Sequence, residues 1–321
     1  MHKLISTLGA VATAAALATA GLPQAAAAAP AVPGFTVSSY AVVADQNRIT
    51  FGSDGSLFIG NTSNAASGAS LHRVAPGGGA VGGYGPAIFD PDAVLFDASG
   101  VVSGVPGSVL VGGDAITAIR PDQTSVVLFS GAAGFSNVGD LAFDQSGRLL
   151  FTDSGNGDPN RRAVFAVEGG ILTRLFREAG GETPDSIAVS ATNQIYTSRS
   201  DGGISVHAAD GSLVNGSFSA ALNPYPAIDF ARGGTFGDQL YALDAVTGVL
   251  WRFDAAGQAA MVGSGFSPNS NEIAFGPDGA LYVGDFNNHL VLRVAAVPEP
   301  ASWGLMLAGA AAVALRLRRR R

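Results

Sequence analysis

One unit of about 45 residues recurs six times between residues 30 and 296, and this period limits the chain to a few repeat architectures. The clearest copies begin at Ile49, Leu141 and Ile273, and each reads as an apolar run, a turn rich in Asp, Gly or Asn, and further short apolar runs. The third residue of each copy is a marker, and successive markers are 45, 47, 46, 41 and 45 residues apart: Phe51, Phe96, Phe143, Val189, Phe230 and Phe275.

Each copy has room for four short strands. Apolar alternation interrupted by turn residues indicates strands rather than helices. The dipeptides Asp54-Gly55, Asp210-Gly211 and Asp278-Gly279 supply the positive φ that tight hairpins need. The second strands are expected at 57–59, 109–111, 149–151, 195–197, 240–243 and 281–283. Four strands repeated six times predict an all-β fold, a six-bladed β-propeller of four-stranded blades.

The sixth copy supplies only three strands, the last at 290–295. An apolar-rich segment at 35–43 precedes the first copy. Pairing it beside 290–295 would complete the blade and close the ring, whereas the alternative is a loose leader. We therefore expect one domain at 29–296.

Residues 1–28 have the layout of a secretory signal peptide: a basic start, an apolar alanine-rich run and small residues for cleavage. Cleavage is expected after Ala28. The alternative, an anchor that stays in the membrane, would need a longer run and a charged stop. The sequence therefore predicts export.

The C-terminal residues 297–321 have three parts in order. Pro298, Glu299 and Pro300 come first, and the apolar stretch 301–315 follows, about 22 Å long as a helix. This is somewhat shorter than a hydrocarbon core of about 30 Å. An arginine cluster ends the chain and includes Arg318, Arg319, Arg320 and Arg321. We expect a transmembrane helix at 301–315 with its arginines in the cytoplasm.

This order of parts resembles the PEP-CTERM sorting signal of Gram-negative bacteria that produce exopolysaccharide. The resemblance implies processing by an exosortase-type enzyme, transient contact with the inner membrane through the C-terminal helix, and a final place at the cell surface or in the extracellular biofilm matrix. A simple tail anchor is the alternative.

The last copy, with Asp285-Phe286-Asn287-Asn288-His289 after its second strand, resembles an NHL repeat. The body is also similar to propellers of the gluconolactonase type. That resemblance implies a divalent metal in the central channel, held by a Glu, an Asn and an Asp from different blades. Asn271 and Asp185 match the last two, but Asn47 stands in the first blade where the Glu is expected.

Polar residues recur four positions before the markers, where the innermost strands should begin. They are Asn47, Asp92, Asp185 and Asn271, with Gly139 and Pro226 in the other two copies. Innermost strands line a propeller channel, so we expect these side chains to ring one mouth, with Asp140, Glu272, Asp153, Asp158 and Asp285 near the same face.

Carboxylate and amide oxygens are the ligands that Ca²⁺ prefers. We predict that Asn47, Asp92, Asp185 and Asn271 hold Ca²⁺ or another divalent cation. Two alternatives stay open: the same residue types cap turns by bonding their own backbone, or they serve catalysis. His72, His207 and His289 share no spacing, which argues against a catalytic or zinc triad, and we expect them to be exposed.

Composition excludes several classes of protein. The chain has no cysteine, so disulfide scaffolds and thiolate metal sites are excluded. The formal charge of −7 hides an acidic body, because residues 30–296 hold 12 arginines and 24 acids. That charge disfavours nucleic acid as a partner.

Taken together, the sequence predicts an exported, exosortase-processed β-propeller that acts as a non-catalytic binding module. Exopolysaccharide or a matrix protein is the expected partner. The alternative is a metal-dependent lactonase-like hydrolase with a cation in the channel.

Overall fold

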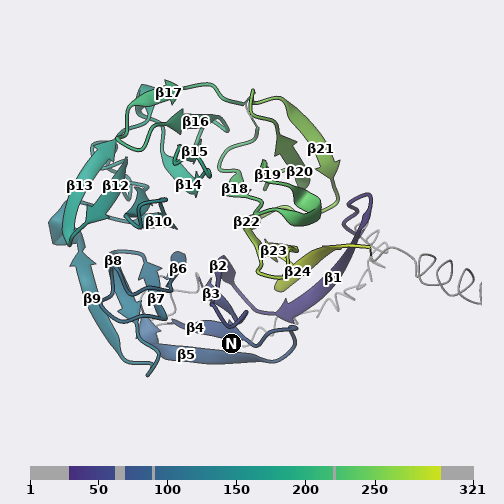
Figure 1. The fold of residues 1–321 in the computed structure, drawn as a ribbon, viewed down its shortest axis with the longest axis horizontal. Helices are drawn as coiled ribbons and strands as arrows, with labels where there is room; N and C mark the ends of the chain where they lie inside the picture. Colours follow the sequence, from purple (N-terminus) through teal and green to yellow (C-terminus); the bar gives the residue numbers. More distant parts are fainter. Residues whose placement is uncertain (1–28, 62–68, 89–90, 220–221, 298–321) are drawn as a thin grey trace, which may run out of the picture.

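The computed structural model describes residues 29–61, 69–88, 91–219 and 222–297. They form six four-stranded antiparallel sheets arranged as blades around a central channel (Figure 1). The predicted six-bladed propeller is therefore confirmed. The predicted signal peptide at 1–28 and transmembrane helix at 301–315 lie outside the described residues. In the described part, none of the helices is long and apolar enough to cross a bilayer.

Every blade has an innermost strand beside the channel, and each of these six strands contains a marker residue. They are β2 (Gln46–Phe51), β6 (Ala93–Asp97), β10 (Val138–Phe143), β14 (Pro184–Val189), β18 (Ala227–Phe230) and β22 (Ser270–Phe275). The second strands all contain the predicted segments. They are β3 (Leu57–Asn61), β7 (Ser108–Gly112), β11 (Leu149–Asp153), β15 (Ile195–Arg199), β19 (Leu240–Asp244) and β23 (Leu281–Asp285).

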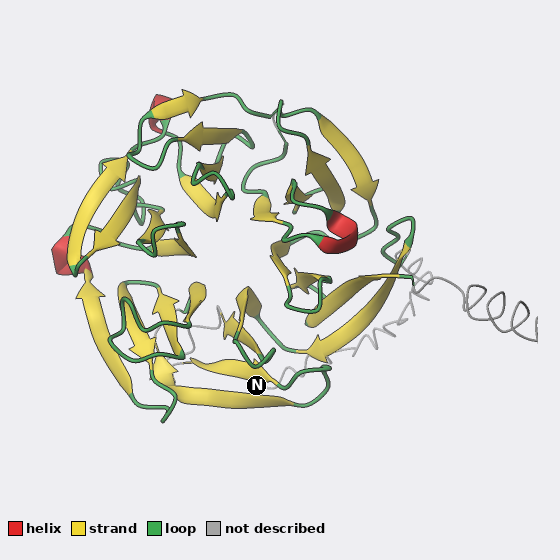
Figure 2. Ribbon diagram, viewed as in Figure 1, coloured by secondary structure: helices red, strands yellow, loops and turns green. Residues whose placement is uncertain are grey.

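The outer half of each blade also has two strands. The third strands are β4 (Ala69–Val74), β8 (Ala115–Ile119), β12 (Ala163–Glu168), β16 (Ile204–His207), β20 (Val249–Phe253) and β24 (Leu290–Ala296). The outermost strands are β5 (Val81–Ile88), β9 (Ser125–Ser130), β13 (Ile171–Phe176), β17 (Leu213–Asn215), β21 (Ala259–Gly263) and β1 (Phe35–Val42). The described residues contain three short 3₁₀ helices in loops, drawn red in Figure 2: η1 (Gly131–Ala133), η2 (Ala179–Gly181) and η3 (Gly234–Phe236).

Burial follows the position of a strand in its blade. All five residues of β7, and likewise of β11, are buried, as expected for strands covered on both faces. The outermost strand β17 is exposed at all three positions. The hairpin glycines Gly55, Gly211 and Gly279 have φ of 79°, 87° and 71°, which confirms the predicted turns.

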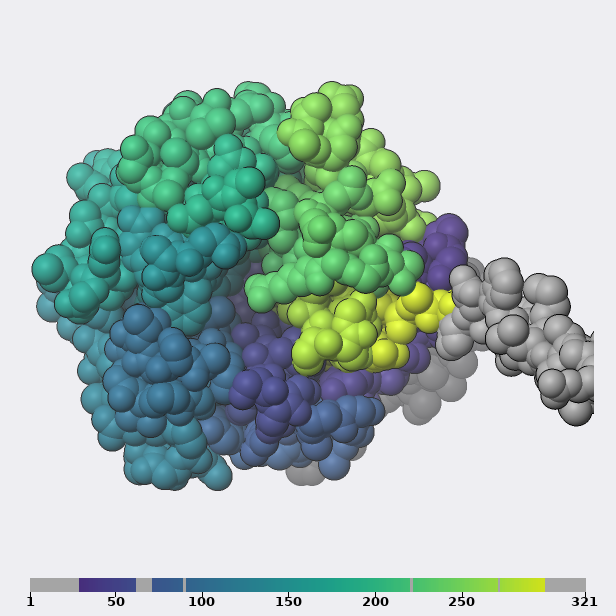
Figure 3. All heavy atoms as spheres, in the orientation of Figure 1, coloured from purple at the N-terminus to yellow at the C-terminus, as the bar shows by residue number. Residues whose placement is uncertain are grey.

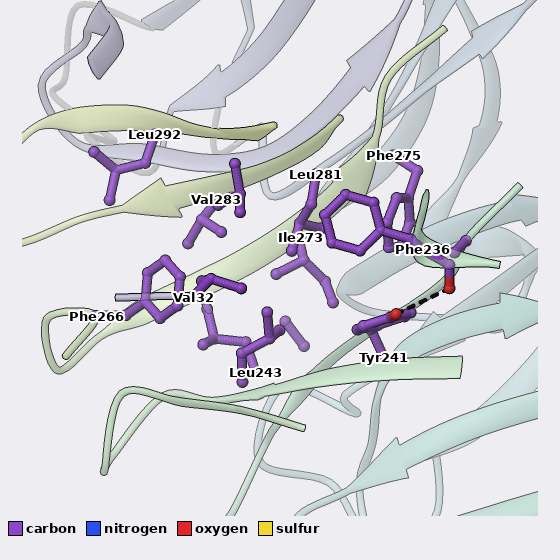
Figure 4. Packing of buried hydrophobic residues seen from close by; sticks show 14 residues of the cluster. Val32, Phe236, Tyr241, Leu243, Phe266, Ile273, Phe275, Leu281, Val283 and Leu292 are labelled. Carbon is purple, nitrogen blue, oxygen red and sulfur yellow. Dashed lines mark hydrogen bonds between the residues drawn. The ribbon is translucent and has the colours of Figure 1, made fainter. Parts of the chain in front are cut away.

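The hydrophobic core lies between blades rather than at the centre of the disc. Figure 4 shows the contact between the fifth and sixth blades, where Leu243 faces Ile273, Leu281 and Val283. The hydroxyl of Tyr241 in this layer donates a hydrogen bond of 2.9 Å to the carbonyl oxygen of Phe236. Apolar side chains fill the space between neighbouring blades, and charged residues such as Asp140, Asp229 and Glu272 lie along the channel together with apolar ones.

The ring closes through its N-terminal strand, as predicted. β1 pairs antiparallel with β24, from Phe35 opposite Ala296 to Val42 opposite Leu290. Upstream of β1, Val32 is buried in the core shared by the fifth and sixth blades, and Ala31 forms a bridge with Ser264. Both ends of the folded body are therefore fastened at the same blade.

Candidate functional site

Four innermost strands are irregular near their N-terminal ends. The pairing register shifts between Gln46 and Ile49, between Val138 and Asp140, between Pro184 and Ile187, and between Ser270 and Glu272. Such shifts turn side chains away from the regular alternation of a strand. They fall at the mouth of the channel, where the polar residues of the repeat stand.

Arg48 lies at the centre of the channel. Its side chain is only 6% exposed, and its Nη1 lies 2.6 Å from Oε2 of Glu272. Its Nη2 lies 3.2 Å from Oδ2 of Asp185, and its Nε donates a hydrogen bond of 3.2 Å to the carbonyl oxygen of Gly139. The guanidinium from the first blade thus contacts the third, fourth and sixth blades. We call Arg48, Asp185 and Glu272 the ion-pair centre.

In the ion-pair centre, Arg48 and each of the two carboxylates shift the pKa of one another. Burial disfavours the charge on Arg48, but the carboxylates of Asp140, Asp185 and Glu272 outweigh it and hold the pKa of Arg48 well above its usual value. Burial raises the pKa of Glu272 well above its usual value, and raises that of Asp185, although Arg48 opposes both shifts. Carboxyl groups outnumber the guanidinium here, so Arg48 supplies the positive charge that they require.

Other channel side chains fasten neighbouring blades to one another. Oδ2 of Asp140 accepts hydrogen bonds from the N–H of Ile187 at 2.9 Å and from the hydroxyl of Ser186 at 3.0 Å. In the same way, Oδ2 of Asp229 accepts a hydrogen bond of 3.1 Å from the N–H of Phe275 in the next blade. Burial raises the pKa of Asp229 to about 6, against the nearby charge of Arg232.

Two cavities open on either side of the ion-pair centre. One, of about 610 Å³, is lined by Asn47, Arg48, Asp92 and Asp185 together with loop residues, and we call it the mouth cavity. The other, of about 720 Å³, is lined by the C-terminal halves of the innermost strands and includes Asp140 and Glu272. Figure 3 shows the centre of one face of the disc as a hollow.

The structure brings three of the four predicted ligand residues to the mouth cavity. Asn47, Asp92 and Asp185 all line it, and Nδ2 of Asn47 donates a hydrogen bond of 3.0 Å to Oδ1 of Asp92. Asn271 lies in β22, but its side chain is outside the described part. Asn47 and Asp185 are the second residues of their strands, whereas Asp92 directly precedes β6.

A divalent cation does not fit the described donors well. Asp185 already forms an ion pair with the guanidinium of Arg48. That guanidinium would repel a divalent cation bound at the same carboxylate, because both are positively charged. Within residues 29–61, 69–88, 91–219 and 222–297, no group of three or more His, Asp or Glu side chains is placed to hold a metal ion. A cation at Asn47, Asp92, Asp185 and Asn271 stays a prediction.

The acids at the ends of two second strands, which were expected near the same face, cap loops. Asp153 accepts hydrogen bonds from the backbone N–H groups of Ser136, Asn137 and Gly155 at 2.9 to 3.1 Å. Asp285 accepts two hydrogen bonds from Asn288, at 3.1 Å from the backbone and 2.8 Å from the side chain. Both carboxylates hold the loops around the mouth in place.

The prediction that the histidines are exposed is wrong for His207, which is 3% exposed in the fourth blade. Its Nε2 lies 3.2 Å from the hydroxyl of Ser205, and that hydroxyl lies 2.9 Å from both carboxylate oxygens of Glu178. The residue types are those of a hydrolase triad. Ser205 is fully buried, however, so no substrate can reach it, and the group links loop and strand instead.

The segment that follows the sixth blade carries a sorting motif. Residues 296–321 match the PEP-CTERM protein-sorting motif. This motif implies export, membrane anchoring and processing by an exosortase in Gram-negative bacteria. The PEP-CTERM segment begins at Ala296, the last residue of β24. The motif covers only the end of the chain, so it identifies a sorting signal and says nothing about the activity of the propeller.

Solved structures share the fold of the body. A gluconolactonase, XC5397 from Xanthomonas campestris, superimposes with a TM-score of 0.65 at 18% identity, covering 82% of this chain and 90% of the other. An auxiliary nutrient binding protein from Bacteroides ovatus gives 0.63 at 14% identity, covering 82% and 76%. A luciferin-regenerating enzyme gives 0.62 at 13% identity, covering 83% and 96%. No curated protein matches the sequence. At these identities the likeness shows the fold alone.

Sequence reasoning missed Arg48 and the aromatic residues Tyr225 and Phe286 of the mouth cavity. A signal for Arg48 existed, because it is the one charged residue in the first innermost strand, Gln46–Phe51. The register shift next to Asn47 hid it, since regular alternation would have sent the two side chains to opposite faces.

Proposed function

We propose that the body of this PEP-CTERM protein is a non-catalytic binding module. After exosortase processing it is displayed at the cell surface or in the exopolysaccharide matrix. The ion-pair centre is the observation that carries the proposal. Arg48 occupies the axis of the channel and pairs with Asp185, one of the two carboxylates that a metal-dependent reaction would use. The loop-lined mouth cavity above it is then a surface for recognition.

The ends of the folded body support processing of this kind. The backbone N–H of Val297 donates a hydrogen bond of 3.2 Å to the carbonyl oxygen of Gly34, so the last strand is held to its final residue. A cut at Pro298, Glu299 or Pro300 would leave all six blades complete. Removal of residues 1–28 as a signal peptide would likewise leave Ala31 and Val32 in their contacts.

The experiment is to fractionate producing cells with and without the sorting enzyme and to measure the mass of the protein in each fraction. The proposal expects a released or re-anchored form that lacks the arginine cluster only when the enzyme is present. A full-length protein that stays in the inner membrane of both strains would refute the sorting part.

A metal-dependent lactonase-like hydrolase is the second candidate, and the fold likeness to a gluconolactonase favours it. In such an enzyme a cation held by Asp92, Asp185 and Asn271 would polarise a carbonyl and activate water. Arg48 beside Asp185 argues against it, because the guanidinium would have to leave before a cation could bind. Metal-dependent lactone hydrolysis that Asp185→Ala abolishes would favour this candidate.

A further inference from the structure

One residue at the rim of the mouth cavity has a strained backbone. Tyr225 has a φ of 59°, in the left-handed region that bulky residues rarely adopt, and its side chain lines the cavity while 46% of the residue is exposed. It also stands between Pro224 and Pro226, and a residue before proline is restricted further. Strain of this kind persists only where the surroundings enforce it, and it concentrates at functional sites.

The surroundings of Tyr225 are rigid. Its backbone N–H donates a hydrogen bond of 3.2 Å to the carbonyl oxygen of Arg199. The guanidinium of Arg199 is itself fixed, 2.9 Å from Oδ2 of Asp201 and 2.7 Å from the carbonyl oxygen of Gly216. Two prolines and this anchored arginine hold the backbone of Tyr225 in one place at the rim. A fixed backbone loses little conformational entropy when a ligand packs on its side chain.

The rest of the mouth cavity supplies hydrogen-bonding groups and a second ring. Phe286 lines it from the sixth blade, and Asn47, Asn137 and Asn269 line it as well. Oδ1 of Asn137 is buried and has no hydrogen-bond partner among the described residues. The cavity therefore offers flat apolar surfaces between amide donors and acceptors.

We propose that the mouth cavity binds a neutral glycan chain, with Tyr225 and Phe286 packing on the apolar faces of sugar rings and the asparagine amides bonding hydroxyl groups. This inference rests on the proposed binding function and names its ligand class. A sugar combines C–H faces with hydroxyls that both donate and accept, which matches this lining. The ligand should lack anionic groups, because the two carboxylates of Asp92 and Asp185 outnumber Arg48 in the lining of the cavity and the body is acidic.

Affinity electrophoresis of the exported protein, purified from producing cells, tests the proposal. The probes are the neutral and the anionic fractions of deproteinised exopolysaccharide from the same cells, together with dextran as a defined neutral glucan. We expect the neutral fraction to slow migration, and Tyr225→Ala and Phe286→Ala each to weaken the apparent Kd at least about tenfold. Tyr225→Phe keeps the ring and should bind as the wild type does. Met261→Ala, at an exposed residue of the outermost strand β21, is the matched control.

Each remaining outcome overturns the inference in its own way. If the neutral fraction slows the migration of Tyr225→Ala as much as that of the wild type, the aromatic ring of Tyr225 does not contribute to binding. Retention by the anionic fraction alone would contradict the ligand class. Binding of deglycosylated matrix protein that Tyr225→Ala abolishes would make the ligand a protein while the binding function stands. A protein that binds neither polysaccharide nor matrix protein refutes the proposed function itself. Thermal melting of each variant separates lost binding from lost folding.

Discussion

Replacing Arg48 by methionine removes the positive charge from the ion-pair centre while keeping most of the volume of the side chain. The buried Glu272 and the partly exposed Asp185 would then remain in the channel without their partner, at positions now 2.6 and 3.2 Å from the guanidinium nitrogens. Breaking a buried ion pair in this way costs about 3 to 5 kcal/mol. For a domain of this size, each kcal/mol lowers the Tm by about 2 to 4 °C, so we expect a loss of about 10 °C.

The loss should also depend on pH. Burial already raises the pKa of Glu272 and of Asp185, and removing Arg48 raises both further. A group whose pKa is higher in the folded state binds protons on folding, so the variant gains stability as the pH falls. We expect the gap between Arg48→Met and the wild type to be wider at pH 8 than at pH 5.

Thermal unfolding followed by circular dichroism at both pH values measures the effect. Arg73→Met is the matched control, because Arg73 forms an ion pair of 2.7 Å with Asp54 in which the two side chains are 45% and 53% exposed. Exposed pairs contribute about 0 to 1 kcal/mol. The account of the ion-pair centre is refuted if the two variants lose the same stability and neither loss changes with pH.

Three further predictions concern stability. Asp229 has a pKa raised from 3.8 to about 6, so the wild type should gain stability as the pH falls through this interval, and Asp229→Asn should lose that gain in urea titrations. A Cβ at Gly257 would lie 1.8 Å from the carbonyl oxygen of Phe218, so Gly257→Ala should lower the Tm far more than Gly104→Ala, which meets nothing within 4 Å at a similarly positive φ. Deleting Phe35–Val42 should collapse thermal stability, because the sixth blade loses its outermost strand, and an unchanged melting curve would contradict the closure.

The sequence was sufficient for the architecture because propeller blades repeat the same local pattern. Each second strand is an apolar run that ends near a turn, and all six predicted runs lie in strands. The spacing of the marker residues set the number of blades. Closure by 35–43 followed from counting strands in the last copy, and β1 pairs there with β24.

Site prediction was less complete for a physical reason. Asn47, Asp92 and Asp185 do meet at one cavity, as their common position in the repeat predicts. The register shifts in β2, β10, β14 and β22 determine which side chains point into the channel. The pattern of polar residues in the sequence does not reveal these shifts. Tyr225 depends on a backbone conformation outside any repeat, so its position at the rim required the structure.

Lactone hydrolysis by the purified protein, assayed with and without Ca²⁺, Zn²⁺ and Mn²⁺, tests the central claim most directly. The claim is that Arg48, rather than a metal, supplies the positive charge of the channel and that the propeller binds without catalysing a reaction. The account predicts no turnover above the uncatalysed background with any of the three ions. Metal-dependent turnover that disappears in Asp185→Ala would contradict it.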